Sequence, residues 1–98
     1  MTEIAERFRA LGEPARLAIL EALREGERTV SDLVEATGQA QANVSRHLAV
    51  LHSAGFVARR REGAYVIYAV SGDEVFRLCD LVCGRIERDA EALAKAVG

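Results

Sequence analysis

The thiols of Cys79 and Cys83 are side chains that could bind a soft metal ion or react with an oxidant. Because the two residues stand at positions i and i+4, a helix would place their side chains about 5–6 Å apart on one flank. In a symmetric pair of chains the thiols could gather near the axis and take a thiophilic ion such as arsenic(III), an oxidant or a reactive sulfur species. The alternative is packing, since Cys79 falls within an apolar helical stripe and cysteine is often buried. The sequence leaves sensing and packing open, with Cys83 as the more exposed thiol.

A second set of side chains has the chemistry needed to bind DNA. Residues 41–54 carry Val44, Leu48 and Leu51 at three- and four-residue spacing, which predicts a helix with one apolar side and one polar side. Side-chain amides can pair with adenine edges in the major groove, and arginines can neutralise backbone phosphates. The candidate DNA contacts, largely left for solvent or a partner, are Gln39, Gln41, Asn43, Ser45, Arg46 and His47, and the candidate phosphate contacts that follow are Arg59, Arg60 and Arg61.

Each of these residues also has a less specific interpretation. The polar residues could be ordinary surface side chains, and the arginine run could be the charged edge of a strand, which hinders sheet-to-sheet pairing. A metal site at His47 or His52 is not expected, because their spacing does not place them on one helix face. If the DNA interpretation is right, Arg46→Ala or Arg60→Ala weakens binding to every DNA sequence, and Gln41→Ala erodes the preference between operators.

A helix-turn-helix followed by a hairpin would position these side chains. Residues 30–56 contain two short helical patterns separated by Thr37-Gly38, and Ser31 could accept a hydrogen bond from a free amide at the start of the first helix. Between residues 56 and 70 the pattern changes to a period near two around a glycine turn. This change predicts a β-hairpin, which in this position is a wing.

The whole pattern predicts a mainly α fold with a β-hairpin wing (α+β), a winged helix-turn-helix formed by residues 1–98 as a single domain. The helix after Pro14 is expected to turn Leu17, Leu20 and Leu23 inward and to end at Gly26. The expected helices cover about residues 3–11, 14–25, 31–37, 41–54 and 73–96, and the expected strands about 56–61 and 65–70.

Charge is divided unevenly along the chain. The formal net charge is −2, but residues 38–70 hold four arginines and one glutamate, whereas the other residues hold 9 basic and 14 acidic side chains. Positive charge is therefore concentrated where DNA contact is predicted, and acidic flanks would help to orient the protein on a duplex. No apolar run is long enough to cross a membrane and no signal sequence opens the chain, so we expect a cytoplasmic protein. Two cysteines are too few for a secreted disulfide framework.

Two separate segments resemble the ArsR-SmtB family of winged-helix repressors. Residues 10–17, ALGEPARL, are similar to the family's "ALSDPTRL", and residues 43–55, NVSRHLAVLHSAG, are similar to its "TVSRHLKVLREAG". The resemblance implies a homodimer formed mainly by the first and last helices. It also implies a recognition helix in each major groove of an inverted-repeat operator, wings along the flanking backbone, and repression that an inducer relieves.

The metal sites of that family do not match this sequence. Thr29 and Ser31 stand where one common site has thiolates, and hydroxyls do not replace thiolates for a soft ion. At the other common site Asp73 aligns with the first ligand, but Val75 occupies the histidine position and no histidine follows. No zinc is therefore expected at the usual family sites.

Three function classes follow from these observations. The first is a DNA-binding transcriptional repressor, derepressed through Cys79 and Cys83 or by another ligand without any metal site. The second is a winged-helix module for protein contact, in which the arginines bind an acidic partner. An enzyme, such as a dithiol reductase, is not expected, because redox cysteines usually lie two residues apart at a helix start.

Overall fold

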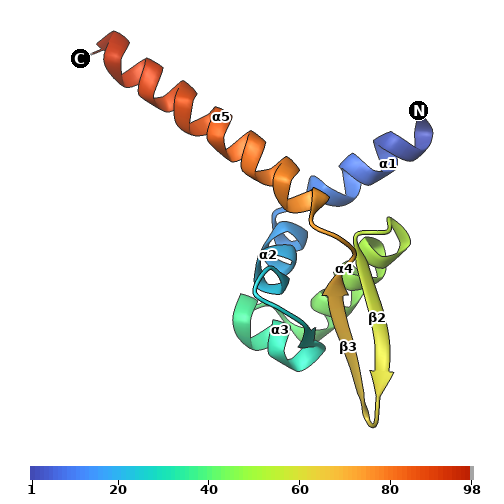
Figure 1. The fold of residues 1–98 in the computed structure, drawn as a ribbon. Helices are drawn as coiled ribbons and strands as arrows, with labels where there is room; N and C mark the ends of the chain where they lie inside the picture. The colour runs from blue at the N-terminus through green and yellow to red at the C-terminus, as the bar shows by residue number, and fades with distance from the viewer. Residues whose placement is uncertain (98) are drawn as a thin grey trace.

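The computed structural model describes residues 1–97 and confirms a mainly helical winged helix-turn-helix (Figure 1). A small antiparallel sheet is the only β structure in those residues. In chain order the elements are α1 (Thr2–Leu11), α2 (Pro14–Leu23), β1 (Arg28–Thr29), α3 (Val30–Thr37), α4 (Gln41–Ser53), β2 (Val57–Glu62), β3 (Tyr65–Val70) and α5 (Glu74–Val97).

The sheet has three strands in the order β1-β3-β2, one more than the sequence predicted. The predicted hairpin is present, and its register runs from Val57 opposite Val70 to Glu62 opposite Tyr65. The additional strand β1 has only two residues, which pair with Tyr68 and Ile67 of β3. Two residues are too few to show a period of two, so the pattern could not reveal this strand.

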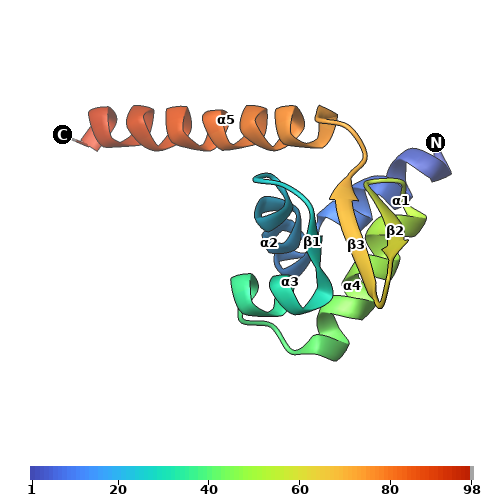
Figure 2. The same ribbon diagram turned by 60° about the horizontal axis from the view of Figure 1, so that its bottom comes forward.

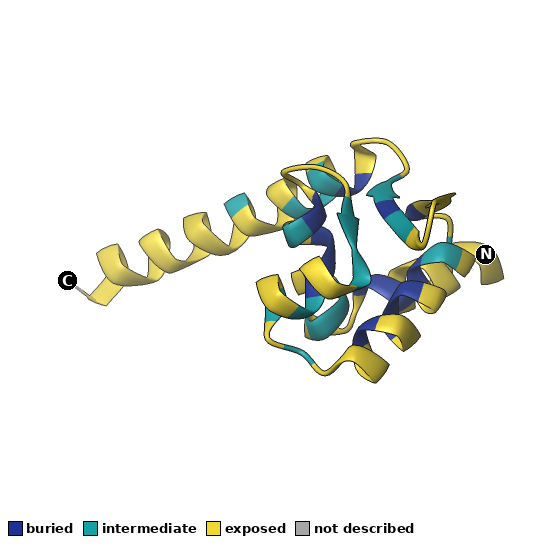
Figure 3. Cartoon of the chain, turned by 90° about the horizontal axis from the view of Figure 1, so that it is seen from below, coloured by how far each residue is buried: buried dark blue, intermediate teal, exposed yellow. Residues whose placement is uncertain are grey.

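The core lies where α2, α3, α4 and the sheet meet. Figure 3 shows buried segments where these elements face one another. The fully buried side chains include Ile19, Leu33, Leu48 and Leu51. The prediction that Leu17 faces inward was wrong, because this side chain is 39% exposed and Ile19 fills the core instead. The dense contact between α2 and the two helices of the helix-turn-helix holds α4 in a fixed position.

Local capping fixes the ends of α3. Thr29, and not Ser31, is its N-cap: the Thr29 hydroxyl accepts from the Asp32 amide at 3.2 Å, and the Asp32 carboxylate accepts from the Thr29 amide at 3.1 Å. Gly38 ends the helix with φ 72°, a left-handed conformation that glycine adopts without strain. One further boundary was wrong, because α2 already ends at Leu23.

Helices α1 and α5 lie on the side of the protein away from the tip of the hairpin, and α5 extends well beyond the body (Figures 1 and 2). Both helices expose apolar side chains. In α5, Val82 is 54% and Ile86 63% exposed, and in α1 both Ile4 and Phe8 are exposed. Such exposed apolar faces are typical of protein interaction surfaces. Within residues 1–97, no helix combines the length and the apolar character needed to cross a membrane.

Candidate nucleic-acid interface

Helix α4 has one buried and one exposed side, as its apolar spacing predicted. Val44, Leu48 and Leu51 are buried in the core. Four of the predicted DNA contacts are exposed at the start and middle of the helix: Gln41, Asn43, Ser45 and Arg46. The structure thus presents an amide-rich polar surface at the N-terminal half of the second helix of a helix-turn-helix, where base edges are read in this class of domain.

His47 does not belong to this surface, and the prediction that it is left for solvent or a partner was wrong. Its side chain is 8% exposed, and its Nδ1 accepts a hydrogen bond from Nη1 of Arg16 at 3.3 Å. Burial, followed by the positive charges of Arg16 and Arg46, lowers the pKa of His47 below its usual value. The spacing contained the signal, since His47 follows Val44 by three residues and precedes Leu51 by four, which places it on the inward face.

Arg16 is a positioning residue that the sequence did not single out. Its Nε donates to the carbonyl oxygen of Ala10 at 2.6 Å, and its Nη2 donates to that of Arg9 at 3.2 Å. These carbonyls are at the C-terminal end of α1, while the same guanidinium holds His47 of α4. Arg16 therefore fixes the recognition helix to the end of α1.

Gln39 was also predicted as a DNA contact, but its side chain is turned toward the protein. The Nε2 atom donates to the carbonyl oxygen of Ala15 at 3.0 Å, in the first turn of α2. Its Oε1 atom is buried and has no hydrogen-bond partner among residues 1–97. Gln39 therefore anchors the turn between α3 and α4.

The three wing arginines do not form one continuous row. Side chains alternate along β2, so Arg59 and Arg61 share one face and Arg60 lies on the other. All three are exposed. Among the described residues, neither Arg59 nor Arg61 pairs with a carboxylate, which leaves their charges available for phosphate.

Arg60 is held by two carboxylates instead. Its guanidinium pairs with Glu27, which immediately precedes β1, and with Glu62 at 3.2 Å. This cluster ties the wing to the loop before β1. Arg60 stays a predicted phosphate contact, and its charge is already compensated within the chain.

The two surfaces predicted to contact DNA, on α4 and on the wing, lie on the same side of the protein (Figure 2). The N-terminal end of α4 and the tip of the β2-β3 hairpin point to the same side, opposite α1 and α5 (Figure 2). In winged helix-turn-helix domains this is the arrangement in which one helix enters the major groove and the hairpin reaches the flanking backbone. The structure therefore separates a polar, basic surface from an apolar one.

Cys79 and Cys83 both lie on α5 and are free thiols. Cys79 is half-buried and packs on the core, and Cys83 is exposed, in agreement with the sequence. The Cys83 thiol donates to the Glu87 carboxylate at 3.6 Å, and the charge of Glu87 raises the pKa of Cys83.

The side chains present do not assemble a metal site within one protomer. No group of three or more histidine, cysteine, aspartate or glutamate side chains in residues 1–97 is arranged to hold a metal ion. Thr29, which stands in place of a family thiolate, has a structural role as the N-cap of α3.

Arg24 connects α2 to α5 near these thiols. Its guanidinium bonds to Asp80 at 3.0 Å and to Glu21 at 3.3 Å, and it lies over the Phe76 ring at 4.5 Å from the ring centre. No local pattern predicts this contact, because Arg24 and Asp80 are 56 residues apart. The contact fixes the start of α5 on the helix that packs against α3 and α4.

Comparison with known proteins gives consistent results. The model of the family described as "Bacterial regulatory protein, arsR family" matches residues 13–59. The chain is 45% identical over 78 residues to a probable mercury resistance operon repressor from Streptomyces lividans, covering 80% of this chain and 60% of that protein. It is 42% identical over 89 residues to the HTH-type transcriptional repressor SmtB from Mycobacterium tuberculosis, covering 91% of this chain and 60% of that protein.

A solved structure is similar over most of the chain. It is the homodimeric winged helix-turn-helix DNA-binding domain of a possible ArsR-family transcriptional regulator from Mycobacterium bovis, a fragment of residues 1–100. The TM-score is 0.82 with 36% sequence identity, and the match covers 93% of this chain and 84% of that one. In contrast, the chain spans only 60% of the length of the two curated relatives.

Proposed function

Because this chain belongs to the arsR family of bacterial regulatory proteins, we propose that it is a sequence-specific DNA-binding transcriptional repressor. The observation that carries the proposal is the exposed polar side of α4 beside the basic wing, on the face opposite α1 and α5 (Figure 2). Gln41, Asn43 and Ser45 would read base edges, and Arg46 would neutralise a phosphate.

The proposed active form is a homodimer through α1 and α5. The exposed apolar side chains of these helices, such as Phe8, Val82 and Ile86, would be buried in the dimer. Two-fold symmetry would place the two α4 helices about 34–36 Å apart, in successive major grooves of an inverted repeat. Arg59 and Arg61 of each wing would then contact the flanking backbone.

A thiophilic signal at Cys79 and Cys83 is part of this proposal. A relative carries the name of a probable mercury resistance operon repressor, and both thiols lie on the helix proposed for dimer contact. Metal binding requires the thiolate, whereas Glu87 favours the protonated form of Cys83. Response to a soft ion would therefore depend on the geometry that the second protomer supplies.

The test is fluorescence-anisotropy binding of the protein to the DNA upstream of its own gene, with excess unrelated competitor DNA. We expect Arg46→Ala to weaken binding to all sequences and Gln41→Ala to reduce the preference for the upstream site. Arg77→Ala is the matched control, because Arg77 is paired with Asp73 on α5 and lies outside the interface. Equal binding to competitor DNA, or an Arg46→Ala effect no larger than that of the control, would contradict the proposal.

A further inference from the structure

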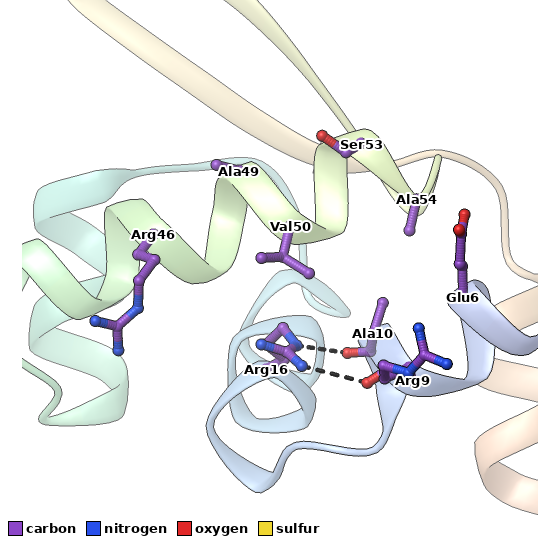
Figure 4. Close-up of a pocket in the computed structure, with 9 residues that line it drawn as sticks. All are labelled: Glu6, Arg9, Ala10, Arg16, Arg46, Ala49, Val50, Ser53 and Ala54. Atoms are coloured by element: carbon purple, nitrogen blue, oxygen red, sulfur yellow. Dashed lines mark hydrogen bonds between the residues drawn. The ribbon is translucent and has the colours of Figure 1, made fainter.

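A groove with a volume of about 630 Å³ separates the C-terminal part of α1 from α4 (Figure 4). Small apolar side chains from both helices line it, namely Ala10, Ala49, Val50 and Ala54. Because three of these four are alanines, the space between the helices is left open. The groove thus has an apolar surface between the helix proposed for dimer contact and the helix proposed for DNA recognition.

The other lining residues are mostly basic. Arg9, Arg16 and Arg46 line the groove, with Glu6 as the single carboxylate. Within residues 1–97 none of these three arginines forms an ion pair with a carboxylate, although arginines elsewhere do. The groove is therefore lined by three arginines and one carboxylate, an excess of positive charge in a chain whose net charge is negative.

Arg16 is held in place by hydrogen bonds within the protein. It is half-buried, and two backbone carbonyls and His47 hold three of its N–H groups. A guanidinium carries further N–H donors, which remain for a ligand. Because the side chain is ordered before binding, little conformational entropy would be lost on contact with an anion.

We propose that this groove binds a small anion with an apolar body, such as an aromatic carboxylate or an aromatic phosphate ester, as the signal that releases DNA. The anionic group would contact Arg16 with Arg9 and Arg46, and the apolar body would lie on the alanines and Val50. This inference rests on the proposed DNA-binding function. It gives that function a regulatory site away from Cys79 and Cys83.

The link to DNA release follows from the position of Arg46. The same side chain lines the groove and belongs to the exposed DNA-facing set of α4. An anion that holds Arg46 in the groove removes one phosphate contact from each recognition helix. A ligand wedged between α1 and α4 also acts on the two elements that Arg16 joins, so it would shift the recognition helix relative to the dimer.

The first experiment measures ligand binding by calorimetry on the full chain without DNA. The probes are phenyl phosphate and benzoate, with neutral benzamide as the control for the apolar body. We expect both anions to bind at millimolar or lower concentration and benzamide not to bind. Arg9→Gln should weaken phenyl phosphate binding about tenfold, because a charged hydrogen bond is lost. Arg7→Gln, the same charge change on the same helix outside the groove, should leave it within about twofold.

A second measurement tests where in the protein the anion binds. An anion next to Arg16 opposes the positive field at His47, so phenyl phosphate should raise the pKa of His47 measured by NMR, while the ring signals of His52 stay unchanged. A shift of both histidines alike, no anion binding, or equal weakening by Arg9→Gln and Arg7→Gln would each overturn the assignment.

Measurements of DNA binding distinguish a groove that binds a free ligand from a groove that binds a phosphate of the DNA backbone. We expect excess phenyl phosphate to weaken operator binding of the unchanged chain and to have less effect on Arg9→Gln. If Arg9→Gln itself lowers the salt dependence of DNA binding as Arg46→Ala does, the groove holds a backbone phosphate and the ligand assignment is refuted. A chain that binds phenyl phosphate but no DNA would refute the repressor function and leave the anion site standing.

Discussion

The split of the wing arginines between two faces predicts different effects for neighbouring substitutions. Arg61→Ala removes one uncompensated cation from each wing. Each lost phosphate contact lowers the slope of log K against log salt by about 0.9, so a dimer should lose about 1.8. At Arg60 two carboxylates, Glu27 and Glu62, already face the one guanidinium. Arg60→Ala should therefore change the slope by less than half as much.

The assay is anisotropy at a series of salt concentrations, with a double-mutant comparison. Glu27→Gln frees Arg60 from one of its partners, so this variant should steepen the salt dependence. The same change in an Arg60→Ala background should have almost no effect. Exposed ion pairs contribute at most about 1 kcal/mol, so the fold should persist in each variant, which thermal unfolding can verify. Equal slopes for Arg60→Ala and Arg61→Ala, together with no effect of Glu27→Gln, would refute this account of the wing.

Three further predictions concern the core, the dimer and the thiols. The pKa of His47 is lowered in the folded chain, so the unfolded chain binds a proton at this histidine more readily. The contribution of His47 to the free energy of unfolding is therefore fully present above about pH 6.5 and is lost as the pH falls toward the pKa of His47 in the folded chain. Urea unfolding at about pH 7.5 and about pH 5.5 should show this loss, reduced by His47→Gln and retained by His52→Gln. Ile86→Glu places a charge on the exposed apolar face of α5 and should yield a monomer in ultracentrifugation that no longer binds DNA; a dimer of unchanged affinity would exclude this face. If the thiols sense a soft ion, arsenite should release DNA from the unchanged chain but not from Cys79→Ser with Cys83→Ser, and a retained response in that variant would remove the thiols from sensing.

Local patterns predicted most of the fold because they arise from residues close in sequence. The spacing of Val44, Leu48 and Leu51 defines both the existence and the buried side of α4, and Gly38 fixes the preceding turn through its left-handed backbone. The hairpin followed from its period of two. The two-residue strand β1 escaped notice, because its pairing with β3 depends on residues almost 40 positions later and not on a pattern of its own.

For the candidate site, the sequence predicted which side chains are exposed better than it predicted which residues they contact. Gln41 and Arg46 are exposed as expected, since the helix period alone decides which side they occupy. The errors fall on side chains whose partners are distant in sequence. His47 contacts Arg16 across 31 residues, Gln39 contacts Ala15 across 24, and Arg60 contacts Glu27 across 33. No window of adjacent residues identifies these partners, although local spacing did indicate that His47 faces inward.

These distant contacts have a common consequence for how a signal could reach DNA. Arg16 and Arg24 both belong to the α2 region, one joined to α1 and α4 and the other to α5. The two helices with exposed apolar faces are thus connected to α4 through one short, well-packed element. A displacement of α5 relative to its partner protomer would act on α2 through Arg24 and Asp80, and α2 in turn packs on both α3 and α4. Because these are discrete hydrogen-bonded contacts, Arg24→Gln should weaken the response of DNA binding to any signal at α5 while leaving the response to a groove ligand between α1 and α4 intact.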